Sequence, residues 1–108
     1  MNNNQLQAIS DLQNWYQQYC DGDWEHNETI RICTIDNPGW LVLIDLEGTD
    51  CENKPFQKIT NDVTEDNWYH CLIQDGKFQG AGGPLNLIDI LTCFNAWAKE
   101  CKNQNFTM

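Results

Sequence analysis

One stretch decides the fold: Asp36-Asn37-Pro38-Gly39-Trp40-Leu41-Val42-Leu43-Ile44-Asp45-Leu46. Pro38 presets φ for one central position of a β-turn, and Gly39 can accept positive φ at the next. After the turn every second residue is apolar, which is the period of a strand, and Leu41 and Leu43 make the opposite side apolar too. We predict a central strand over residues 40–46, paired in an antiparallel hairpin with a strand over residues 29–33.

Helical patterns flank this region. Residues 5–20 carry apolar side chains at steps of three and four, typical of one helical face. The predicted face consists of Leu6, Ile9, Leu12, Tyr16 and Tyr19. A second helix is predicted from Asn86, which can cap it, to about Glu100. Its apolar stripe consists of Leu87, Leu91, Phe94, Ala98 and Cys101.

Further strands are predicted between the hairpin and the second helix. Residues 56–63 form a weaker candidate and residues 67–73 a stronger one, and Asp75-Gly76 favours a hairpin to a short return strand at 77–79. The glycine-rich segment 80–84 is expected to break regular structure. The prediction is an α+β domain: an N-terminal helix, an antiparallel meander of four to five strands and a C-terminal helix, with both helices on one face of the sheet.

Length and charge limit the classes of function. The 108 residues fit one domain over 1–108, with 1–4 and 103–108 expected to be frayed. A formal net charge of −10 argues against nucleic acid and membrane partners and favours a basic protein partner. Neither a membrane-spanning run nor a signal peptide is recognisable, so we expect a cytoplasmic location. The six cysteines are widely spread and are read as free thiols.

The densest chemistry lies in Cys20-Asp21-Gly22-Asp23-Trp24-Glu25-His26. Cys20 with His26, and His70 with Cys71, are the candidate metal ligands, but adjacent strand residues point to opposite faces of a sheet. We therefore predict no metal and no cofactor.

Segment 80–84 lacks the Lys-Ser/Thr pair of a phosphate loop. An enzyme would need Cys20 or Cys71 as a nucleophile beside one of the histidines, and no spacing fixes that geometry, so no catalytic residue is predicted.

Binding is a second interpretation of the same stretch. Carboxylates on a connector can form a surface for a basic partner, and tryptophan is enriched among the residues that dominate binding energy. Trp15 lies off the predicted helix stripe and is an anchor candidate if it is exposed. The candidate binding residues are Asp21, Asp23, Trp24, Glu25 and Trp15, with a second acidic group at Glu47, Asp50 and Glu52.

The order of several blocks resembles the immunity protein 53 family of bacterial polymorphic toxin systems. These blocks are Leu12-Gln13-Asn14-Trp15-Tyr16, Cys20 to His26, Asp36-Asn37-Pro38-Gly39-Trp40, Asp66-Asn67-Trp68, His70-Cys71, Phe78-Gln79-Gly80-Ala81-Gly82-Gly83-Pro84, Asn86-Leu87, Ile90-Leu91 and Trp97-Ala98. The resemblance covers nearly the whole chain. It implies a cytoplasmic, non-enzymatic protein that binds a cognate toxin domain.

Three functional hypotheses follow. The leading one is an immunity protein that neutralises a toxin domain by stoichiometric, non-covalent binding, where the toxin could be a basic nuclease. The alternatives are a small cysteine-dependent hydrolase or transferase, and an acidic scaffold or regulator that binds another basic protein. The sequence selects no oligomeric state.

Overall fold

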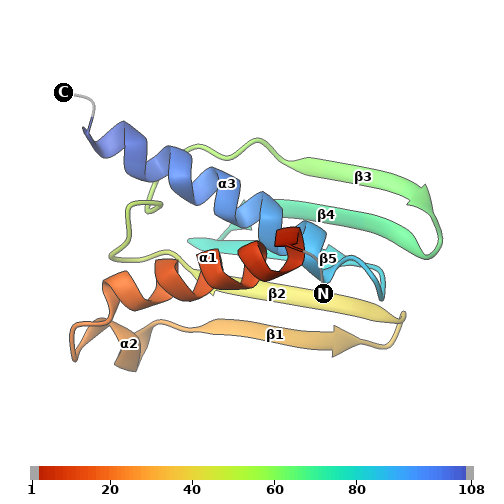
Figure 1. Cartoon of the computed structure of the whole chain (residues 1–108), viewed down its shortest axis with the longest axis horizontal. Coiled ribbons are helices and arrows are strands. Elements are labelled where there is room, and N and C mark those ends of the chain that lie inside the picture. Colours follow the sequence, from red (N-terminus) through yellow and green to blue (C-terminus); the bar gives the residue numbers. More distant parts are fainter. Residues whose placement is uncertain (1–2, 107–108) are drawn as a thin grey trace.

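The computed structural model describes the backbone of residues 3–106 and the side chains of residues 3–103. It confirms the α+β class and the order of a helix, a five-stranded antiparallel sheet and a helix (Figure 1). The elements are α1 Asn3–Tyr19, α2 Trp24–Asn27, β1 Ile30–Ile35, β2 Gly39–Asp45, β3 Ile59–Thr64, β4 Asn67–Gln74, β5 Lys77–Gly82 and α3 Leu87–Phe106. Residues 1, 2, 107 and 108, which belong to the termini expected to fray, lie outside the described residues.

The sheet has the order β1-β2-β5-β4-β3, and every neighbouring pair is antiparallel. The predicted hairpin of β1 and β2 is confirmed, with Ile32 opposite Val42. The meander is interrupted once, because the chain leaves β2 and crosses to the far edge before β3, β4 and β5 return toward β2. The long connection over residues 46–58 makes that crossing possible, and Cys51 within it is buried in the core.

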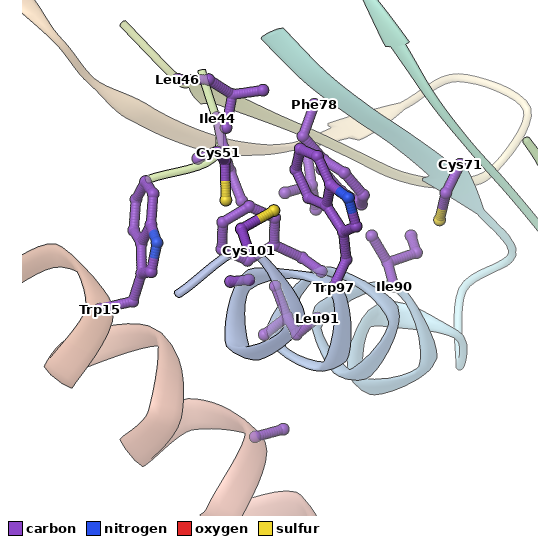
Figure 2. Close-up of a cluster of buried hydrophobic side chains, with 14 residues drawn as sticks. Trp15, Ile44, Leu46, Cys51, Cys71, Phe78, Ile90, Leu91, Trp97 and Cys101 are labelled. Carbon is purple, nitrogen blue, oxygen red and sulfur yellow. The ribbon is translucent and has the colours of Figure 1, made fainter. Parts of the chain in front are cut away.

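Both long helices cover one face of the sheet, as predicted (Figure 1). The register places Ile44, Phe78 and Ile73 in one row across three strands, with Ile44 and Phe78 fully buried. Phe94 of α3 packs against Phe78 with ring centroids 5.1 Å apart. Figure 2 shows the core between the sheet and α3, where Trp97 and Ile90 reach toward the strands. Among residues 3–106, neither long helix lies on the opposite face of the sheet.

The predicted inner face of the first helix is wrong in part. Leu6 is 52% exposed, whereas Ala8 and Trp15 are buried. Trp15 packs edge-on against Phe94 of α3, with ring centroids 4.9 Å apart. The buried face of α1 differs from the predicted one because α1 packs mainly on α3 rather than on the strands. The small side chain of Ala8 lets the two helices lie close together. There the Ala8 carbonyl accepts a hydrogen bond of 3.0 Å from the buried side-chain amide of Asn95.

The prediction that residues 80–84 break regular structure is also wrong in part, because β5 continues to Gly82. The glycines serve close packing: a Cβ at Gly80 would overlap Cγ2 of Ile90 in α3. Asn86 directly precedes α3, as predicted, but its side-chain oxygen accepts from the backbone N–H of Trp68 in β4 at 3.2 Å. Its role is therefore to attach the start of α3 to the sheet.

Candidate functional site

The structure brings the two acidic segments of the sequence together at one end of the sheet. The indole N–H of Trp24, in α2, donates to the backbone carbonyl of Glu47 at 2.8 Å. Gly48 lies directly under that indole, because a Cβ at this residue would approach Trp24 Cδ1 to 3.1 Å. The connector after α1 and the connector after β2 therefore form one continuous surface.

Asp21 and Glu25 shape the first connector. One Asp21 oxygen accepts from the backbone N–H groups of Asp23 and Trp24, each at 2.9 Å. Glu25 reaches back and accepts from the N–H groups of Asp21 and Gly22 at 2.9 and 2.8 Å. Gly22 has φ of +92°, which favours glycine. Backbone N–H groups stabilise the ionised carboxylates, so the pKa values of Asp21 and Glu25 lie below their ordinary values; for Glu25 its own N–H contributes most, ahead of those of Asp21 and Gly22.

Trp24 is half-buried and closes an aromatic group at the end of α1. Its ring lies 5.6 Å from Tyr19, 5.7 Å from Tyr16 and 6.2 Å from Trp15. Trp15 is 7% exposed, so its indole contributes to the core and does not form the exposed anchor considered from the sequence. Because of these contacts α2 has a fixed position although it is only four residues long.

Asp50 has a structural partner. The Tyr19 hydroxyl donates to an Asp50 carboxylate oxygen at 2.9 Å and accepts from the Asp50 backbone N–H at 3.1 Å. Burial, together with the neighbouring Asp50 carboxylate, raises the pKa of Tyr19. Asp50 therefore ties the second connector to α1.

The remaining carboxylates face outward. Asp23 is exposed and makes no capping bond to α2, and Glu47 and Glu52 are exposed as well. Glu28 is not among the candidates predicted from the sequence, because it follows the dense stretch as an isolated acidic residue. Burial raises its pKa, and the negative charges of Asp45, Glu47 and Glu52 raise it further. We call the following set the acidic surface: Asp21, Asp23, Glu25, Glu28, Glu47 and Glu52.

The acidic surface is hollowed rather than flat. An open groove is lined by Asp21, Asp23, Trp24, Glu28, Glu47 and their neighbours. The Lys77 ammonium pairs with Asp45 at 3.0 Å and interacts electrostatically with Glu28 of the groove. The groove therefore combines an aromatic wall with four carboxylates, an arrangement that suits a cationic side chain of a partner.

Cys71 and His70, one pair considered for catalysis, lie on opposite faces of the sheet. Cys71 is fully buried on the helix-covered face, and a hydrogen bond with Cys93 together with burial raises its pKa. His70 is directed to the other face, where its Nε2 lies 2.6 Å from Asp62. Cys20 donates to the backbone carbonyl of Tyr16 at 3.4 Å. Among residues 3–103, no group of three His, Cys, Asp or Glu side chains could hold a metal ion.

Comparison with protein families matches residues 9–99 to the family model described as Immunity protein 53. The matched region contains the whole acidic surface, α1 from residue 9 onward and α3 up to residue 99. Searches of curated proteins and of solved structures found no match. No helix in the described part of the chain is long and apolar enough to cross a membrane.

Proposed function

The chain belongs to the immunity protein 53 family, and on that basis we propose that it binds a cognate bacterial toxin domain and neutralises it by stoichiometric, non-covalent inhibition. The proposal places this action in the cytoplasm of the cell that carries the toxin gene. It assigns no catalytic step to the chain.

One observation supports the acidic surface as the contact region. The bond between Trp24 and Glu47 holds two acidic connectors at a single end of the sheet. Of 22 formally charged Lys, Arg, Asp and Glu residues only six are basic. Such a surface attracts a basic cleft, speeds association and disfavours partners of like charge.

The partner proposed is a toxin domain with a basic cleft, and a nuclease fits this description. A nuclease cleft binds phosphates, and carboxylates of the acidic surface would occupy the positions of those phosphates. Arginine side chains of the cleft can form paired hydrogen bonds with carboxylates as they do with phosphates. Trp24, at the wall of the groove, offers a flat apolar surface beside those charges.

Co-expression tests the proposal. The chain is produced in a bacterial host together with the C-terminal toxin domain encoded beside its gene, and growth and co-purification are scored. We expect restored growth and a complex of fixed stoichiometry. Growth arrest despite normal production of the chain would contradict the proposed function.

A thiol variant distinguishes binding from cysteine chemistry. We expect the variant with both Cys20→Ser and Cys71→Ser to retain protection, provided that its melting curve shows a folded protein. Loss of protection in the exposed Cys20→Ser single variant, with an unchanged melting curve, would favour a cysteine-dependent enzyme instead.

A further inference from the structure

β1 forms one edge of the sheet, and half of its backbone groups point away from the neighbouring strand. The Asp45 N–H donates to the Thr29 carbonyl at 3.1 Å, so Thr29 directs its backbone toward β2. In an antiparallel pair this direction alternates from residue to residue. The N–H and C=O groups of Ile30, Ile32 and Thr34 therefore point outward, in the spacing that a further strand requires.

The two edges of the sheet are not protected equally. The β3 edge has a register shift between Asp62 and Thr64, and such a bulge hinders edge-to-edge pairing. The β1 edge pairs with β2 without interruption from Ile30 to Ile35, contains no proline and carries a single charge, on Arg31. Proteins usually protect such a regular strand edge against pairing with other chains. An unprotected edge at β1 therefore points to a partner that binds there.

Exposed apolar side chains lie beside this edge. Ile32 shares a row with the fully buried Val42, so it points to the helix-covered face, yet it is 41% exposed. On α1, Tyr16 is 37% exposed. Tyr16 and Ile30 line the same open groove, which connects the helix with the edge strand. A strand added next to β1 would cover these side chains.

The same groove carries negative charge at one end. Glu25 and Glu28 line it beside Ile30, and both belong to the acidic surface. We propose that β1 pairs with an extended segment of the toxin domain, with alternate apolar side chains facing α1 and a basic residue beside Glu25 and Glu28. The inference rests on the proposed function and extends its contact region from the acidic surface along the β1 edge. A second copy fits this edge less well, since each chain carries a net charge of −10.

Amide hydrogen exchange, followed by NMR on the full chain, tests the inference. In the free protein we expect the amides of Ile30, Ile32 and Thr34 to exchange fast and those of Arg31 and Cys33 to exchange slowly. In the purified complex with the co-expressed toxin domain, all five should exchange slowly. A complex in which Ile30, Ile32 and Thr34 still exchange fast would overturn this inference and leave the proposed function intact.

A backbone variant gives the second measurement. Thr34→Pro removes an outward N–H without breaking a bond to β2, and Thr34→Val keeps that N–H as a matched control. We expect Thr34→Pro to weaken toxin binding by at least about tenfold and Thr34→Val by less than about threefold. Equal affinities of the two folded variants would overturn the inference.

If the amides of Ile30, Ile32 and Thr34 exchange more slowly as the concentration of the free protein rises, without toxin, the edge pairs with a second copy. That result would overturn the inference as well. Absence of any complex would overturn the proposed function and this inference together.

Discussion

The indole N–H of Trp24 donates to the backbone carbonyl of Glu47 at 2.8 Å, across 23 positions of the sequence. This bond joins α2 to the connector that follows β2. Together with the bonds between Tyr19 and Asp50, it holds the two groups of carboxylates on neighbouring connectors. Trp24 therefore acts on the acidic surface by positioning, since its ring also packs against Tyr16 and Tyr19 of α1.

Trp24→Phe tests this positioning role. The substitution keeps an aromatic ring but removes the donor, so we expect a loss of about 1 kcal/mol in the free energy of unfolding and weaker toxin binding. Trp40→Phe is the matched control, because the Trp40 indole donates to the Pro84 carbonyl at 2.9 Å at the other end of the sheet. Urea unfolding and calorimetric titration measure both quantities. Equal loss of toxin affinity in the two variants would contradict the assigned role.

The inner face of α1 gives a stability prediction. Trp15→Ala removes a buried ring and should cost about 3–5 kcal/mol in the free energy of unfolding. Leu6→Ala alters a side chain that is 52% exposed and should cost less than about 1 kcal/mol. Chemical denaturation of both variants checks the assignment. If Leu6→Ala lost more unfolding free energy than Trp15→Ala, the face predicted from the sequence would be the buried one.

The sequence predicts element types well and their packing less well. Asp75-Gly76 predicts its hairpin correctly, since both residues have the positive φ that such a turn needs. The face of α1 is misassigned because periodicity counts large apolar residues, whereas packing on α3 selects Ala8 and Trp15. Gly39 is predicted for a turn, but it is the first residue of β2. A glycine is needed there because a Cβ would overlap the Gly82 carbonyl of the neighbouring strand. Such contacts arise from residues far apart in the sequence, so no local pattern contains them.

The same limit applies to the candidate site. The sequence identifies the acidic residues of both connectors, but only the structure separates Asp50, which is bound to Tyr19, from the outward Glu47 and Glu52. Glu28 joins the surface through folding alone, as the negative neighbours that raise its pKa show. Their common position is set by contacts between the two connectors, among them the Trp24 hydrogen bond to Glu47.

The close approach of α3 to β5 predicts the effect of Gly80→Ala. The added methyl group would overlap Ile90, so we expect a loss of about 1–3 kcal/mol in the free energy of unfolding. Combining Gly80→Ala with Ile90→Ala should cost less than the sum of the two single variants, because each relieves the other's misfit. Thermal unfolding of the four proteins measures this coupling. Strict additivity would contradict the contact.

The pKa of Asp21 predicts a pH dependence of stability. Backbone N–H groups of Trp24 and Asp23 lower this pKa below its ordinary value of 3.8, so the ionised form stabilises the fold. That contribution is complete above the ordinary value and is lost as the pH falls through the lower folded value. Asp21→Asn should therefore be less stable than the parent at pH 6, and the difference should shrink below pH 3.8. Urea unfolding across this range measures it, and a difference that does not change with pH would contradict the assignment.

Charge reversal on the acidic surface addresses the central claim. The test variant combines Asp23→Lys, Glu47→Lys and Glu52→Lys, three exposed residues of the acidic surface. The control combines Asp36→Lys, Glu65→Lys and Asp66→Lys, three exposed residues in the turns at the opposite end of the sheet. Both variants change the formal net charge equally, so a general effect of charge on association affects both alike.

The deciding measurement is the dissociation constant of each folded variant with the purified toxin domain at one fixed ionic strength. If the acidic surface contacts the toxin, the test variant loses about 2–5 kcal/mol of binding free energy, roughly 30-fold or more in Kd, and the control stays close to the parent. An unchanged Kd for the test variant, or an equal loss in the control, would show that the toxin binds elsewhere.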